Sequence, residues 1–136
     1  MEGAKELDRS GPDRVRTIDP ELLLQQLRSG RAVTVADVRP TDDYRGPDGR
    51  VPGARSVPMD ELVARCEELT PHRSEPIVVV SGRGERARTA AVALELAGFT
   101  EVVALDGGMR TWIDLGLPVE HATVPPSRPV PSSRRG

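Results

Sequence analysis

Residues 77–80 of this 136-residue chain are Ile-Val-Val-Val, four branched apolar side chains in a row. A run without polar alternation is typical of a strand that is buried on both faces, as in a parallel sheet. Ser81 ends the run, a glycine-rich loop follows, and residues 86–97 have an alanine-rich helical pattern that Gly98 closes. Strand, loop and helix in this order predict one unit of an α/β fold.

The same alternation of strands and helices extends along the chain. The other expected strands, all short, are 15–18, 32–38, 54–58 and 101–105. The other expected helices are 20–30, 59–69 and a short one after Gly108. Asp19 is a suitable N-cap for the first of these helices, with Pro20 at its first position. The pattern therefore predicts a mostly parallel sheet with helices between its strands.

One domain, residues 15–121, is expected from this pattern. Residues 1–14 are polar and charged, and we expect a flexible segment there. Residues 122–136 are rich in proline and arginine and have little to bury, so we expect a disordered tail.

Charge and composition exclude some classes of function. The formal net charge is −2, which does not suggest nucleic-acid binding. No segment approaches the roughly 18 continuous apolar residues of a membrane span. The single cysteine, Cys66, rules out an intramolecular disulfide. We therefore expect a cytoplasmic protein that binds neither nucleic acid nor membrane.

The loop after residues 77–80 has the chemistry of an anion site. Its residues are Ser81, Gly82, Arg83, Gly84, Glu85 and Arg86. Ligands of open α/β sheets bind where strands end and helices begin, because the first N–H groups of a helix have no internal partner. The two glycines let the backbone curl around an anion, and the arginines outnumber the single acid. A plain strand-to-helix turn with solvated arginines is the alternative that the loop alone leaves open.

Four motifs along the chain form a recognisable series. In order they are Asp37-Val38-Arg39, Asp43-Tyr44 followed by 49–54, the loop 81–86, and 107–112 followed by 116–118. In these motifs residues 17–120 resemble the rhodanese-like (thiosulfate sulfurtransferase) domains. The resemblance implies a five-stranded, mostly parallel sheet with helices on both faces and a pocket whose floor is the loop. It also implies supporting roles for Asp37, Arg39 and Arg50.

Two residues depart from the pattern of that family. Arg50 replaces its usual histidine, and Ser81 stands where the family carries its cysteine nucleophile. The family reaction moves a sulfane sulfur onto the cysteine as a persulfide. A thiol has a pKa of about 8.5, which loop amides and arginines can lower, whereas a serine hydroxyl needs an adjacent general base. His72 precedes the strand that leads to Ser81, and nothing in the sequence ties His121 to the loop.

We therefore expect a non-catalytic rhodanese-like domain, with Ser81 at an inactive catalytic position. Its loop would bind a small oxyanion (thiosulfate, sulfate or phosphate) or a protein partner, without a cofactor or a metal. The alternative is a sulfurtransferase in which Ser81 is an engineered replacement for cysteine. A serine hydrolase or phosphatase is a third reading and requires an imidazole beside Ser81. Cys66 and Trp112 are expected in the core.

Overall fold

The computed structural model of the chain describes residues 14–70 and 72–121. The expected flexible segment at 1–14, apart from Arg14, and the expected tail at 122–136 lie outside the described residues. In the described part no helix combines the length and the apolar character needed to cross a bilayer.

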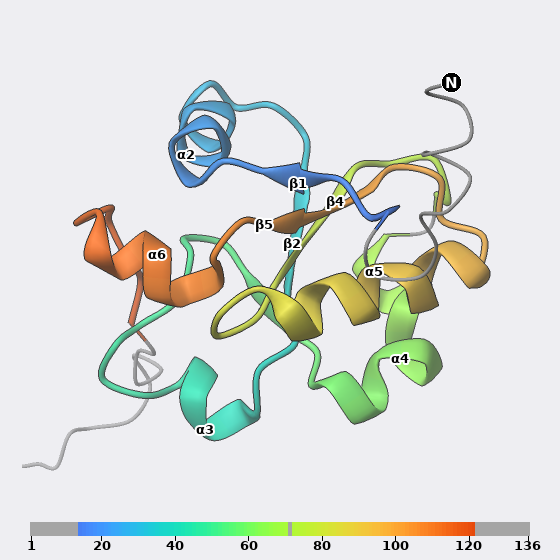
Figure 1. The fold of residues 1–136 in the computed structure, drawn as a ribbon. Helices are drawn as coiled ribbons and strands as arrows, with labels where there is room; N and C mark the ends of the chain where they lie inside the picture. Colours follow the sequence, from blue (N-terminus) through green and yellow to red (C-terminus); the bar gives the residue numbers. More distant parts are fainter. Residues whose placement is uncertain (1–13, 71, 122–136) are drawn as a thin grey trace, which may run out of the picture.

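The centre of the domain is a five-stranded sheet (Figure 1). Its strands are β1 (Thr17–Ile18), β2 (Thr34–Asp37), β3 (Arg55–Ser56), β4 (Ile77–Val80) and β5 (Val102–Leu105). They lie in the order β1-β5-β4-β2-β3, and every neighbouring pair is parallel. The apolar run at 77–80 is the middle strand, and all four of its residues are buried. The prediction of a buried central strand is confirmed.

Helices cover both faces of the sheet. They are α2 (Pro20–Arg28), α3 (Thr41–Tyr44), α4 (Leu62–Leu69), α5 (Glu85–Leu96) and α6 (Gly108–Asp114), with a 3₁₀ turn η2 (Met59–Glu61) before α4. Ile77 and Val79 of β4 join the core under α4 and α5. Val78 and Val80 point the other way and join the core under α2 and α6. Alternate side chains of one strand thus supply both cores, each buried residue contributing about 1.5–3 kcal/mol.

Local sequence signals set most of the boundaries of the helices. Asp19 caps α2 by accepting a hydrogen bond from the Glu21 N–H at 3.0 Å, as expected.

Cys66 and Trp112 are buried in the two cores, also as expected. The helix expected over 59–69 begins as the 3₁₀ turn η2, and α3 lies where only a loop was expected. This four-residue helix has no apolar periodicity from which it could be predicted.

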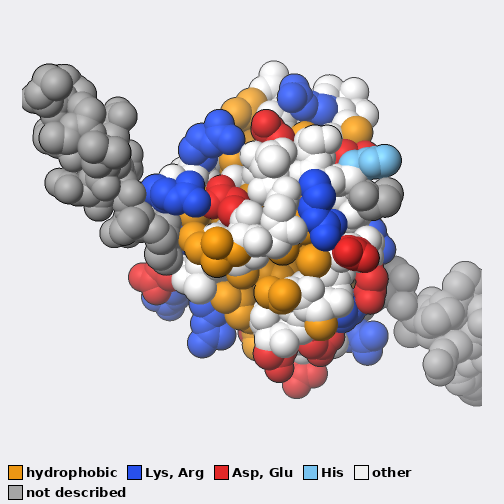
Figure 2. All heavy atoms as spheres, turned by 90° about the vertical axis from the view of Figure 1, so that its right-hand side faces the viewer, with side chains coloured by type: hydrophobic (Ala, Val, Ile, Leu, Met, Phe, Trp, Pro, Cys, Tyr) orange, Lys and Arg blue, Asp and Glu red, His pale blue; other side chains and the backbone are white. Residues whose placement is uncertain are grey.

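Some apolar side chains remain at the surface beside α4 and α5. Val63 of α4 is 60% exposed and Leu96 of α5 is 85% exposed. Figure 2 shows the face on the right of Figure 1, where hydrophobic side chains gather in the middle and charged side chains surround them.

The start of α6 packs directly against the loop after β4. The N–H groups of Met109 and Arg110 donate to the carbonyl oxygens of Ser81 and Gly82, at 2.8 and 2.9 Å. Gly108 makes this approach possible, since its φ is +64° and a Cβ atom there would lie 2.5 Å from the Ser81 carbonyl oxygen. A side chain at position 108 would therefore push α6 off the loop.

We predict that Gly108→Ala lowers the free energy of unfolding by about 2–5 kcal/mol, because left-handed strain and the clash with the loop add together. Gly116→Ala is the matched control: its φ is +72° and nothing lies within 4 Å of an added Cβ. It should cost only the backbone strain, about 1–2 kcal/mol. Urea denaturation measures both, and equal losses would contradict the close contact.

Candidate anion-binding site

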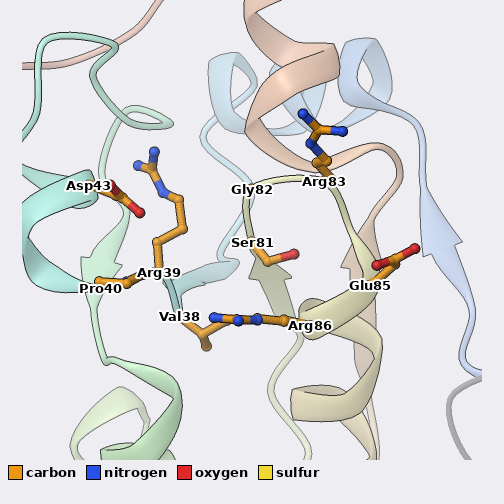
Figure 3. Close-up of a pocket in the computed structure, with 9 residues that line it drawn as sticks. All are labelled: Val38, Arg39, Pro40, Asp43, Ser81, Gly82, Arg83, Glu85 and Arg86. Carbon is orange, nitrogen blue, oxygen red and sulfur yellow. The ribbon is translucent and has the colours of Figure 1, made fainter.

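The loop between β4 and α5 borders a hollow of about 230 Å³ at the carboxyl end of the central strand (Figure 3). Residues 81–83, 85 and 86 line it on the side of the loop. Val38, Arg39, Pro40 and Asp43 line it from the segment that follows β2. Because β2 and β4 are parallel neighbours, their ends bring these two segments together.

Ser81 lies at the bottom of the loop and is 2% exposed. Its Oγ accepts hydrogen bonds from the N–H groups of Gly84 and Ala87, at 3.0 and 3.1 Å. Figure 3 shows its side chain inside the bend of the loop. No described residue accepts a hydrogen bond from the hydroxyl, so its hydrogen is free for a molecule in the hollow. Ser81 is thus a buried donor that two amides polarise.

Several backbone N–H groups of the loop are also free to bind an anion. Those of residues 82, 83, 85 and 86 have no hydrogen-bond partner among the described residues. Gly84, at the N-cap of α5, has a φ of +104° and no capping side chain of its own, and in the first turn Ser81 Oγ accepts only from the Ala87 N–H. The partial positive charge at the start of α5 therefore lies open beside Ser81. Free amides and a helix start form a cradle that fits an oxyanion.

The side chains around the hollow add little net charge. Its charged residues are Arg39, Arg83, Arg86, Asp43 and Glu85. Since Arg39 is already paired with buried Asp37, the two remaining arginines are balanced by the two acids. Arg86 reaches across the hollow toward Val38, whereas Glu85 points away from Ser81 (Figure 3). Arg88, two residues further along α5 than Arg86, does not line the hollow. Preference for an anion therefore depends mainly on backbone groups.

Asp37 and Arg39 form a buried ion pair beneath the hollow. Arg39 Nη2 lies 2.8 Å from Asp37 Oδ2, and the side chains are 8% and 0% exposed. Arg39 Nη2 also donates to the Gly49 carbonyl oxygen at 3.0 Å. The pair fixes Arg39 at the edge of the hollow and ties the end of β2 to the turn at position 49.

Arg50 lies on the far side of that turn and does not line the hollow. Its guanidinium stacks on the Tyr44 ring, 4.3 Å from the centroid, and its Nε is 3.6 Å from Glu120 Oε1. The Tyr44 hydroxyl donates to the Ala54 carbonyl oxygen at 2.6 Å, and burial raises the pKa of that phenol. Arg50 therefore has no direct contact with the hollow, and it can affect the site only through the backbone of residues 49–54.

The remaining polar candidates lie elsewhere. His72 is exposed and precedes β4, at the opposite end of that strand from Ser81, and His121 is exposed at the end of the described residues. Within the part that the structure describes, no group of three or more His, Cys, Asp or Glu residues could hold a metal ion. Pro40 and Asp43 line the hollow but follow β2, whereas the loop follows β4. Because the two segments are far apart in the sequence, the sequence did not predict that these residues line the hollow.

The fold and the hollow define a parallel α/β domain with a loop of free backbone amides after its central strand. The rhodanese-like domain family matches residues 19–115, and the chain belongs to that family.

The chain is similar to proteins of several kinds. It is 39% identical over 101 residues to the HTH-type transcriptional regulator Rv0324 of Mycobacterium tuberculosis, a match that covers 73% of this chain and 42% of the regulator. The rhodanese-like domain of the Alr3790 protein from Anabaena has a TM-score of 0.70 and 31% identity, covering 83% of this chain and 86% of that one. Thiosulfate sulfurtransferase from Pseudomonas aeruginosa has a TM-score of 0.73 and 28% identity, covering 80% of this chain and 21% of the enzyme. The chain spans about half the length of most curated relatives that it matches.

We predict that Arg39→Met lowers the free energy of unfolding by about 3–5 kcal/mol, because it leaves the buried Asp37 carboxylate without a charged partner, with only the N–H of residue 39 still donating to it. Arg65→Met removes two ion pairs at the surface of α4, with Glu61 and Glu68, and serves as the control. Its cost should stay within about 1 kcal/mol. Chemical denaturation distinguishes the two variants, and a small loss for Arg39→Met would contradict the supporting role of the buried pair.

Proposed function

We propose that this chain is a non-catalytic rhodanese-like domain that binds an anionic group on the loop 81–86 and does not transfer sulfur. One observation carries the proposal: the Ser81 hydroxyl occupies the amide cradle, at the position where the family resemblance places a cysteine nucleophile. The ligand would be a small oxyanion (thiosulfate, sulfate or phosphate) or an acidic or modified group of a protein partner. The proposal includes a cytoplasmic location, because a chain with a single cysteine has no intramolecular disulfide and suits a reducing compartment.

A hydroxyl in this cradle is poorly suited to sulfur transfer. Amides that lower the pKa of a thiol to the neutral range cannot make a usable alkoxide from serine, whose activation requires a base. No described residue accepts the hydroxyl hydrogen of Ser81, so no such base is in contact with it. Serine also cannot store sulfur as a stable persulfide.

The same hydroxyl is well suited to binding. A thiolate would place a negative charge in the cradle and repel an incoming anion. The neutral Ser81 hydroxyl instead accepts two amide hydrogen bonds and directs its own hydrogen toward the ligand. Together with the free N–H groups of residues 82, 83, 85 and 86, it offers an anion only donors.

The second candidate is a sulfurtransferase in which Ser81 is an engineered replacement for cysteine. The similarity to the Pseudomonas enzyme favours it, as do the two amides that would stabilise a thiolate at position 81. In that reaction the thiolate attacks the outer sulfur of thiosulfate, the S–S bond breaks and sulfite leaves with the bonding electrons. Cyanide then takes the outer sulfur as thiocyanate and releases the thiolate.

We predict no cyanide-dependent thiosulfate sulfurtransferase activity in the unmodified chain. Ser81→Cys should gain it, because the cradle then holds a thiolate. Thiocyanate formation measures the reaction, and mass spectrometry should find one added sulfur on residue 81. The double variant Ser81→Cys/Cys66→Ala is the control that assigns the activity to position 81. Thiocyanate formation by the unmodified chain would overturn the non-catalytic proposal.

We also predict that sulfate shifts the amide NMR signals of residues 82–87 in the unmodified chain, with an affinity that stays constant between about pH 6 and 9, the range in which a thiol titrates. In Ser81→Cys the affinity should fall at least about tenfold as pH rises through the pKa of the thiol, since the thiolate repels sulfate. The absence of any sulfate-dependent shift at the loop would contradict anion binding.

Two arginines of α5 provide a matched control for this titration. Arg86 lines the hollow and Arg88 does not. Arg86→Gln should weaken sulfate binding about two- to tenfold, because one charged donor to the anion is lost. Arg88→Gln removes the same charge from the same helix and should leave the affinity nearly unchanged. Equal effects would show a general charge effect and not a contact in the hollow.

A further inference from the structure

Two more hollows adjoin the one that contains Ser81. The second, of about 330 Å³, shares Arg39, Asp43, Gly82 and Arg83 with it. The third, of about 350 Å³, shares Val38, Pro40 and Arg86 with it. The shared lining shows that the three hollows adjoin one another, with the hollow of Ser81 in the middle, and we call the three together the trench. Each is large compared with a tetrahedral oxyanion, so a free oxyanion leaves most of the trench empty.

The second hollow carries excess negative charge. Asp42, Asp43 and Asp48 line it, and none of them has an ion-pair partner among the described residues. Two of the three arginines in the same lining are already paired, Arg39 with Asp37 and Arg110 with Asp114. Only Arg83 remains against three carboxylates. A basic side chain placed in this hollow would therefore be stabilised.

The third hollow has mainly apolar walls. Val38, Pro40, Pro58 and Met59 form them, and Asp60 and Arg86 complete the lining. Pro58 and Met59 are half-buried, so a ligand can cover what remains exposed of them. An apolar side chain that lies here would bury that surface at about 25 cal/mol per Å². The trench thus offers three environments in series: acidic, amide-lined and apolar.

We propose that the trench binds an extended segment of a partner protein, with an anionic side chain over Ser81, a basic residue on one side and an apolar residue on the other. The inference rests on the proposed anion binding and names its partner. Ser81 supports the middle position of the anionic side chain, since it is 2% exposed and its hydroxyl hydrogen has no acceptor in the described part of the chain. Side chains two residues apart lie on the same face of an extended peptide, about 7 Å from one another, so they can enter adjoining hollows.

Charge argues against other large ligands for the same trench. Nucleic acids are uniformly anionic along their backbone, and the carboxylates of Asp42, Asp43 and Asp48 would repel a second phosphate. A free oxyanion uses neither the acidic nor the apolar hollow. A peptide is the ligand that carries positive, negative and apolar groups on neighbouring residues.

The test uses phosphoserine pentapeptides with two lysines on one side and two leucines on the other, made in both chain directions, and inorganic phosphate as the reference. Isothermal titration should show that one direction binds at least about tenfold more tightly than phosphate, because two further hollows are filled. Replacing the two lysines by glutamates should lower the affinity at least about threefold through repulsion in the acidic hollow.

Variants separate the acidic hollow from the anion cradle. Asp42→Asn/Asp48→Asn changes residues that line only the second hollow. It should weaken the lysine peptide about three- to tenfold and leave phosphate affinity unchanged or slightly higher. Glu67→Gln/Glu68→Gln removes the same charge from the surface of α4 and should change neither affinity. Weaker binding of the lysine peptide to Asp42→Asn/Asp48→Asn, but not to Glu67→Gln/Glu68→Gln, would place the lysines in the acidic hollow.

The other outcomes contradict one proposal or both. If phosphate binds and the lysine peptides bind no more tightly, the partner inference is wrong and anion binding stands. The same conclusion follows if the glutamate peptide binds as well as the lysine peptide. If neither phosphate nor any peptide binds, the proposed function fails together with the inference.

Discussion

Two backbone hydrogen bonds from the start of α6 determine the shape of the loop on which the site depends. They turn the carbonyl groups of Ser81 and Gly82 toward Met109 and Arg110. In a planar trans peptide the N–H group points opposite to the carbonyl group, so the N–H groups of residues 82 and 83 turn away from α6. The cradle is therefore a property of peptide geometry, and Gly108 is the residue that allows the two segments to approach.

The residue at position 81 determines the charge and the hydrogen-bonding capacity of the cradle. The amides of Gly84 and Ala87 are present whichever side chain they meet. A sulfur atom there would gain negative charge, while the oxygen of serine stays neutral and keeps a hydrogen to donate. One atom at position 81 thus changes the charge and the hydrogen bonding of the same backbone site. The side-chain charges around the hollow of Ser81 are balanced, so the backbone donors dominate its electrostatic character.

Local patterns predicted the central strand, the cap of α2, the core positions of Cys66 and Trp112 and the site of the loop. These features depend on residues that are close in sequence, such as Asp19 and Glu21. The parts that could not be predicted depend on contacts across the sheet. Asp43 lines the same hollow as Ser81 because β2 and β4 are neighbours. Arg50 contacts Tyr44 and Glu120 and does not line the hollow. That Arg50 replaces the family's histidine did not indicate that it would contact Tyr44 or Glu120.

The contact between α6 and the loop also has a consequence for the order of events in folding. The donors of Met109 and Arg110 come long after Ser81 in the chain, beyond α5 and β5. A growing chain that has completed β4 and α5 holds the residues of the loop but lacks the groups that orient its carbonyls. The loop therefore takes its final conformation late, when the last helix docks, and a chain that ends before α6 lacks the groups that hold this conformation.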